Sequence, residues 1–226
     1  HIGNGDHNFV YSGDIKYGKS MLLESADTRF PRVETLLVES TYGAKEDIQP
    51  TREEVEGAFI KSVNEILKGG GKVLIPIPAV GRAQELMMVI DKYMKSGQLI
   101  ESPVFMEGMI QEATAIHEAH PEYLERSLKQ KILETDDNPF DSEYFTNIEH
   151  ADGRDEPLRE DTPCIVIATS GMLEGGPVLE YFRNFAPDKR NKILFVSYQV
   201  NGTLGRRVMD GARQVTIMGQ DGKVQV

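Results

Sequence analysis

Apolar runs and helical patterns alternate through the middle of the chain. Short runs with little polar alternation are typical of strands buried on both faces of a parallel sheet. Such runs stand at 72–78, 104–106, 164–169 and 192–199. Stretches with helical spacing lie between them, at 51–68, 86–93 and 110–120. The alternation predicts an α/β domain from about residue 51 to 208, with a parallel-rich sheet flanked by helices.

Capping residues, glycines and prolines mark where several of these elements begin and end. Thr51-Arg52-Glu53-Glu54 has the pattern of a capping box, and Gly69-Gly70-Gly71 is a stop signal. The apolar face expected between them consists of Val55, Phe59, Val63, Ile66 and Leu67. The prolines in 72–78 predict an edge strand or a strand with an early exit.

Strands are also predicted on both sides of this α/β region. Apolar residues at 8–14 and 35–43 indicate two strands, and a hairpin is predicted from 213–218 and 223–226 around Gln220-Asp221-Gly222. Asp14 and Glu39 then stand at the carboxyl ends of the first two strands. Ligand sites gather at such ends in open α/β sheets, although a single acid there is also a common turn former.

A glycine-rich loop follows the apolar run 164–169. Ser170-Gly171-Met172-Leu173-Glu174-Gly175-Gly176 leads to Pro177, which is a helix-start residue. A strand, a glycine loop and a helix start together aim free backbone N–H groups at one point, where a phosphate can sit. The alternative is an ordinary packing turn, because such turns are common in α/β folds.

Charge and composition narrow the class of protein. The net charge of -11 argues against a general nucleic-acid coat, but residues 162–226 carry 8 Lys+Arg against 5 Asp+Glu, which leaves room for a local basic patch. The acidic stretch 134–161 is expected to form a solvated loop or short helices. With one cysteine and no apolar run of membrane-spanning length, a cytoplasmic protein that does not enter a membrane is expected.

Several ordered motifs together resemble one family. They are Tyr11-Ser12-Gly13-Asp14, Val38-Glu39-Ser40-Thr41-Tyr42-Gly43, Pro78-Ala79-Val80-Gly81-Arg82-Ala83-Gln84-Glu85, Ala168-Thr169-Ser170-Gly171-Met172 and the run from Ser197 to Arg206. This set resembles the β-CASP family of metallo-β-lactamase-fold ribonucleases. The stretch 108–117 is similar to the archaeal homologues of the endonuclease subunit of the cleavage and polyadenylation specificity factor.

The resemblance implies a division of the chain and a metal chemistry. Residues 1–43 would end the first metallo-β-lactamase half, 44–208 would form the β-CASP domain, and 209–226 would begin the return to the lactamase domain. Family members carry two zinc ions, and the resemblance makes Asp14 a ligand that bridges them. It also makes Glu39 a catalytic carboxylate that pairs with a downstream histidine.

The resemblance also implies a function for a longer protein. The His-x-His-x-Asp-His motif of the family is absent from these 226 residues, so the chain is expected to be an inactive fragment of a zinc-dependent RNA endonuclease. Messenger RNA 3′-end processing or RNA decay is the expected role, and a homodimer is a further expectation for the full-length protein.

A phosphate-binding wall for single-stranded RNA is predicted at the glycine-rich loop. Its members are Ser170, Gly171, Met172, Gly175, Gly176, Arg206 and Arg207, with Arg82 as a weaker candidate. Alternatively, one arginine caps a helix or pairs with Glu180. Two other classes stay open, a non-catalytic RNA-binding or dimer-forming α/β module and a nucleotide-binding domain. The last lacks both glycine-rich nucleotide signatures and ranks lowest.

Overall fold

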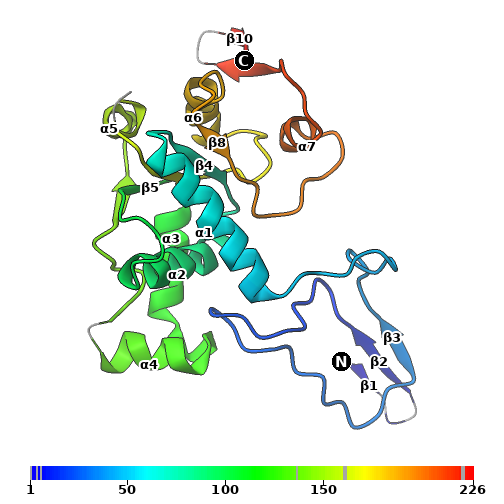
Figure 1. Ribbon diagram of the computed structural model, residues 1–226. Coiled ribbons are helices and arrows are strands. Elements are labelled where there is room, and N and C mark those ends of the chain that lie inside the picture. The colour runs from blue at the N-terminus through cyan, green and yellow to red at the C-terminus, as the bar shows by residue number, and fades with distance from the viewer. Residues whose placement is uncertain (1, 4, 6, 136, 160–161, 220–221) are drawn as a thin grey trace.

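A five-stranded parallel sheet forms the centre of the molecule (Figure 1). The computed structural model describes residues 2–3, 5, 7–135, 137–159, 162–219 and 222–226. The strand order is β6-β5-β7-β4-β8. The strands are β4 (Val73–Pro76), β5 (Val104–Glu107), β6 (Phe145–Ile148), β7 (Ile165–Ala168) and β8 (Lys192–Ile193). All their pairings are parallel, which confirms the predicted α/β class.

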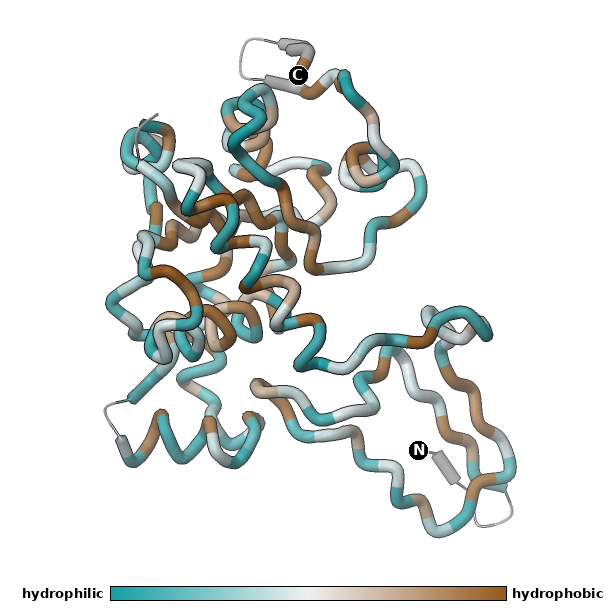
Figure 2. Tube along the Cα trace, in the orientation of Figure 1, coloured by the Kyte–Doolittle hydropathy of each residue, from teal (hydrophilic) through white to brown (hydrophobic). Residues whose placement is uncertain are grey.

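Helices cover both faces of this sheet. One face packs on α1 (Arg52–Lys68), α2 (Arg82–Lys95), α3 (Ile110–Ala119) and α4 (Arg126–Glu134). The other face packs on α6 (Val178–Phe185) and on the strand β9 (Thr216–Gly219). Alternate residues of β4 divide between the two layers, with Ile75 in one and Leu74 in the other. Figure 2 shows the apolar segments gathered where the sheet and helices meet.

The first helix forms as its capping box predicts. The Thr51 hydroxyl accepts from the Glu54 backbone N–H, and the Glu54 carboxylate accepts from the Thr51 N–H at 2.8 Å. Its buried face differs from the predicted one, because Val55 is 52% exposed and Glu56 takes an inward position. The Glu56 carboxylate is tolerated there because Arg52, Lys92 and Tyr93 all donate to it.

The position of β4 corrects one prediction about its prolines. The strand leaves the ladder after Pro76, as the early-exit alternative predicted, but it lies between β7 and β8 rather than at an edge. The N–H groups of Val73 and Ile77 point to β7, so position 76 faces β8. Since the β8 ladder reaches only to Leu74, a residue without an N–H is accommodated at position 76.

Two other strands differ from their predicted extents. The acidic stretch 134–161 contains the edge strand β6 as well as the short helices η2 (Ala151–Arg154) and α5 (Asp155–Leu158). The predicted strand 192–199 keeps ladder pairing only over Lys192–Ile193, and residues 193–197 are half-buried. The glycine-rich loop and this segment therefore do not follow adjacent strands, because β4 separates β7 from β8.

A small second sheet precedes the α/β domain. It consists of β1 (Ile2–Gly3), β2 (Asn8–Tyr11) and β3 (Thr35–Leu37), and the β2–β3 pair is parallel. The remaining elements are η1 (Pro121–Tyr123), α7 (Leu204–Met209) and β10 (Gly222–Gln225). β9 and β10 form the predicted antiparallel hairpin, although its turn residues Gln220 and Asp221 lie outside the described residues. None of the helices described in the structure is long and apolar enough to cross a bilayer.

The segment between β2 and β3 is fastened to the α/β domain at Glu125. This buried carboxylate accepts from the Lys19 ammonium at 2.7 Å and from the backbone N–H groups of Ser127 and Leu128 at the start of α4. Leu22, also buried, accepts from the Glu125 N–H. Burial by itself would raise the pKa of Glu125, but the hydrogen bonds outweigh it and hold the pKa at about 2.

Glu125 is therefore expected to make stability depend on pH. Since its folded pKa is depressed, its contribution is complete above its ordinary pKa near 4.5 and is lost as the pH falls toward 2. Glu125→Gln is expected to cost about 1–2 kcal/mol at pH 7, with the difference from the native chain shrinking toward pH 3. Urea unfolding at several pH values measures this. Glu65→Gln, at an exposed position in α1, is the control, and a cost that does not change with pH would contradict the assignment.

Candidate nucleic-acid interface

The loops that follow β4, β5 and β7 meet at the carboxyl edge of the five-stranded sheet. The backbones of these loops come closest to each other at glycines. A Cβ at Gly171 would stand 2.7 Å from Pro78 Cδ, and a Cβ at Gly108 would overlap the Thr169 hydroxyl. These contacts hold the glycine-rich loop 170–176 against its neighbours, so its shape is fixed by the ends of three strands.

A second segment, residues 199–205, is bonded directly to the glycine-rich loop. The Met172 carbonyl accepts from the Gly205 N–H at 2.9 Å, and the Glu174 carboxylate accepts from the Leu204 N–H at 2.6 Å. The Gln199 side chain, which is buried, donates to the Gly171 carbonyl at 2.9 Å. The structure thus brings the loop 170–176 and the turn before α7 together. Sequence reasoning missed the bonding roles of Glu174 and Gln199, although polar residues within a glycine-rich turn are a usable signal.

The start of α6 differs from the predicted anion site. Its first N–H groups are already bonded, from Val178 to the Thr169 carbonyl at 3.0 Å and from Glu180 to the Pro177 carbonyl at 3.0 Å. The Ser170 hydroxyl accepts from the Glu174 N–H. The expectation of free backbone donors aimed from this helix start is therefore wrong, because the tight turn bonds to itself. The N–H groups at the start of α6 are therefore not available to a phosphate.

The predicted arginines at this edge differ in whether their side chains already form an ion pair. Arg206 Nε donates to both carboxylate oxygens of Asp210 at 3.0 Å, four residues along α7. The alternative pairing with Glu180 is therefore wrong for Arg206, because Arg206 pairs with Asp210 and Glu180 pairs with Arg183. Arg207 is exposed, and so is Arg82 at the first position of α2; neither side chain makes an ion pair within the part of the chain that the structure describes.

The two predicted carboxylates lie beyond the ends of neighbouring strands. β2 and β3 are paired in parallel with Tyr11 opposite Leu37, so Asp14 and Glu39 leave the small sheet at the same edge. The Ser12 hydroxyl accepts from the Glu39 N–H at 3.1 Å and joins the two strand ends. A hydrogen bond from the Thr41 backbone N–H holds the pKa of Glu39 below its usual range.

A pair of tyrosines connects this strand end to the turn before α7. The rings of Tyr42 and Tyr198 lie edge to face, with centroids 6.2 Å apart and an interplanar angle of 89°. Tyr42 stands three residues after Glu39, and Tyr198 precedes the Gln199 anchor. The carboxylate region and the predicted RNA-binding loops are thus joined through side chains, a contact that the sequence did not predict.

The residues around Asp14 and Glu39 do not form a complete metal site by themselves. Over the described ranges, no group of three or more His, Cys, Asp or Glu side chains is placed to hold an ion. A zinc ion commonly takes about four protein or water ligands, and Asp14 supplies one carboxylate. A metal pair of the kind implied by the resemblance would need ligands from outside these 226 residues.

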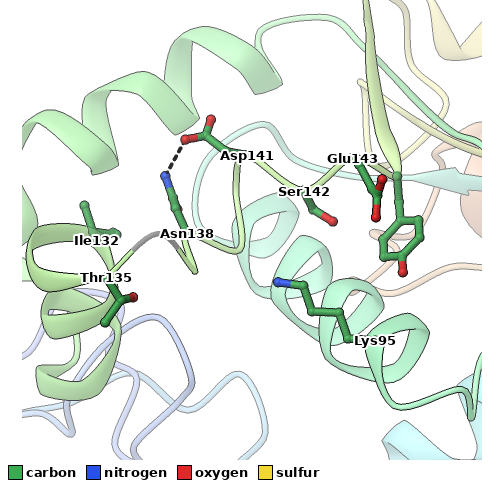
Figure 3. A pocket seen from close by; sticks show the side chains of 8 residues that line it. Lys95, Ile132, Thr135, Asn138, Asp141, Ser142 and Glu143 are labelled. Carbon is green, nitrogen blue, oxygen red and sulfur yellow. Dashed lines mark hydrogen bonds between the residues drawn. The ribbon is translucent and has the colours of Figure 1, made fainter.

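One hollow in the molecule lies away from this edge. It has a volume of about 420 Å³ and stands at the opposite, amino edge of the sheet, between the end of α2 and the start of β6 (Figure 3). Its lining includes Lys95, Asn138 and Ser142. The Lys95 ammonium in this hollow is already paired with Asp91 and Asp137.

Comparison with known proteins gives the class of this chain. The family model described as the Beta-Casp domain matches residues 83–208, more than half of the sequence. The chain therefore belongs to the β-CASP family, as its motifs predicted.

The relatives are archaeal proteins that share one name. The chain is 79% identical over 226 residues to the transcription termination factor FttA of Cenarchaeum symbiosum. It is 51% identical over 226 residues to the protein of that name from Pyrococcus abyssi, and 50% identical over 226 residues to that from Thermococcus kodakarensis. Each match covers 100% of this chain but 35% of the relative, so the chain spans about a third of their length.

Proposed function

We propose that this chain is the RNA-binding part of a longer β-CASP protein that acts in archaeal transcription termination. The observation that carries the proposal is the junction of the loop 170–176, the turn before α7 and the strand end at Glu39. It places exposed arginines and exposed tyrosines at one edge of the sheet. Such a combination suits a flexible, charged strand with unpaired bases, which is single-stranded RNA.

The proposed contacts divide by chemistry. Arg206 and Arg207, with Arg82 further along the edge, would bind phosphate oxygens, since a guanidinium offers two parallel N–H donors. Ser170, Gly171, Met172, Gly175 and Gly176 would form the floor, where the backbone lets a sugar–phosphate chain approach closely. The Arg206–Asp210 pair is no obstacle, because a surface ion pair contributes little and a phosphate can replace the carboxylate.

The catalytic part of the proposal concerns the full-length protein. We assign it to a zinc-dependent ribonuclease in which Asp14 is one metal ligand and Glu39 is a catalytic carboxylate. The remaining ligands would come from outside this chain. The division into residues 1–43, 44–208 and 209–226, the cytoplasmic location and a homodimer belong to the same proposal. Termination replaces the 3′-end processing and RNA decay expected from the sequence, since the relatives carry that name.

A non-catalytic RNA-binding or dimer-forming module is the second candidate. The absence of a complete ligand set among the described residues is the observation that favours it. Cleavage by the full-length protein decides between the two, because a binding module leaves the RNA intact whatever metal is added.

The salt dependence of RNA binding is expected to reveal the arginine contacts. Arg206→Ala and Arg207→Ala in the full-length protein should each weaken binding similarly across RNA sequences and lower the slope of log K against log salt by about 0.7, one phosphate contact each. Titrations of a fluorescent single-stranded RNA at several salt concentrations measure this. The control is Arg126→Ala, which removes an exposed arginine at the start of α4. A variant with unchanged slope and affinity would make that arginine a structural residue.

A further inference from the structure

The Tyr42–Tyr198 pair differs from the buried aromatic pair of the α/β domain, Tyr181 and Phe185. Tyr181 and Phe185 also stack at an angle, with centroids 6.0 Å apart, but they are 0% and 2% exposed and belong to the core. Tyr42 is 53% exposed and Tyr198 is 49% exposed. Burial of apolar surface explains the first pair and leaves the second without an equivalent reason.

The edge-to-face geometry leaves most of the ring surface open. In such a pair the edge of one ring covers one face of the other, so at least three of the four faces are not covered by the partner ring. Contacts between aromatic rings of this kind contribute about 0.5–1.5 kcal/mol, which helps to hold the rings in place. The pair is therefore a partly ordered aromatic surface before any ligand arrives.

The backbone beneath both rings is also fixed. Next to Tyr198, the Gln199 side chain is 2% exposed and donates to carbonyls of Gly171 and Ser197. On the other side, Tyr42 lies in a turn closed by the Gly43 N–H donating to the Ser40 carbonyl at 3.0 Å. Rings on anchored turns lose little freedom when they bind a ligand, and this favours affinity.

A cationic side chain, Arg206, lies near Tyr198. Arg206 is held mainly by Asp210, and Tyr198 is close enough to contribute to the raised pKa of its guanidinium. Arg207 follows it on α7 and is exposed. An aromatic surface flanked by cations matches the alternation of bases and phosphates along a single strand.

We propose that Tyr42 and Tyr198 form a stacking platform for one unpaired base of single-stranded RNA, with the next phosphate at Arg206 or Arg207. The proposal rests on the RNA-binding function proposed above and names the base-binding part of that site. Because Tyr42 comes from the segment after β3 and Tyr198 from the α/β domain, the stacked base would contact both parts of the chain. Stacking tolerates any base, so the platform adds affinity without sequence preference.

The test uses the full-length protein and two matched RNAs, a uridine oligonucleotide and the same chain with abasic sites. Tyr198→Ala is expected to weaken binding of the intact RNA by about 5- to 150-fold, the range of one base–aromatic stack, with an unchanged salt slope. Tyr198→Phe keeps the ring and should bind as the native protein does. On the abasic RNA, which keeps its phosphates, the native protein and Tyr198→Ala should bind alike. Tyr42→Ala repeats the measurement on the other ring.

Different outcomes overturn different statements. If the native protein binds intact and abasic RNA equally, or if Tyr198→Phe loses as much as Tyr198→Ala, the stacking platform is wrong while RNA binding stands. If the native protein binds no single-stranded RNA at low salt, the proposed function falls and the platform with it. Tyr198→Leu, which keeps an apolar side chain, serves where circular dichroism shows that the alanine variant has not folded.

Discussion

Glu107→Ala is expected to lower the free energy of unfolding by about 3–5 kcal/mol, the usual cost of removing one partner of a buried ion pair. Glu107 ends β5, is 8% exposed, and accepts from Arg154 Nε at 3.0 Å on each carboxylate oxygen. The Tyr181 hydroxyl, fully buried, donates to the same carboxylate at 2.6 Å. Alanine would leave a guanidinium and a phenol without their common acceptor.

Urea unfolding of the 226-residue chain, followed by circular dichroism, measures this cost. Glu112→Ala is the matched control, because Glu112 is an exposed carboxylate that lines, together with Glu107, a hollow of about 440 Å³. It should change stability by no more than about 0.5 kcal/mol. Glu107→Gln keeps an acceptor for one donor and should fall between the two. A loss below about 1 kcal/mol for Glu107→Ala would mean that water replaces the carboxylate and that the network is not truly buried.

Asp14→Ala in the full-length protein is expected to reduce RNA cleavage by about 1,000-fold or more, equivalent to about 4 kcal/mol of transition-state stabilisation. The reason is its place: Asp14 is an exposed carboxylate just beyond β2, at the edge it shares with Glu39, and we propose it as a metal ligand. Zinc content should fall together with the rate, because a lost ligand weakens the metal and not only the reaction.

Glu39→Gln is the comparison that separates the two carboxylates. It keeps an oxygen for the Thr41 N–H but removes the negative charge, so the rate should fall while zinc content stays at the native value. Single-turnover rates and metal analysis on both variants provide the readouts. Equal zinc loss in the two variants would contradict their separate roles. Unchanged cleavage by the Asp14→Ala variant would show that Asp14 is not a ligand of the metal.

Local signals predicted much of the α/β domain because its elements are built from them. The capping box at Thr51 and the glycines at 69–71 bound α1 by hydrogen bonds within a few residues. β6 was not predicted because Phe145-Thr146-Asn147-Ile148 is an edge strand with a single buried residue, Ile148, and lies in an acidic stretch. The apolar run 192–199 was read as one strand, but apolar packing continues there after the ladder to β4 has ended.

The candidate site was predictable in its parts and not in its assembly. The glycine-rich loop and the arginines are visible in the sequence, and the Arg206–Asp210 spacing of four residues is a readable helical pair. One feature depends on which loops the fold brings together, the contact of Tyr42 with Tyr198 across 156 residues of chain. It has no local signature. The bonding of the N–H groups at the start of α6 is local, to the carbonyls of Thr169, Gly176 and Pro177, but a glycine-rich pattern does not distinguish bonded N–H groups from free ones.

Photo-crosslinking tests the proposed RNA interface most directly. Single-stranded RNA labelled with 4-thiouridine would be irradiated in complex with the full-length protein, and the crosslinked peptides identified by mass spectrometry. The proposed interface predicts crosslinks at residues 170–176 and 197–207, with Tyr42 or Tyr198 among the modified side chains and competition by unlabelled RNA. Crosslinks confined to the helices α1 and α4, or to segments outside this chain, would contradict an RNA-binding role for the carboxyl edge of the sheet.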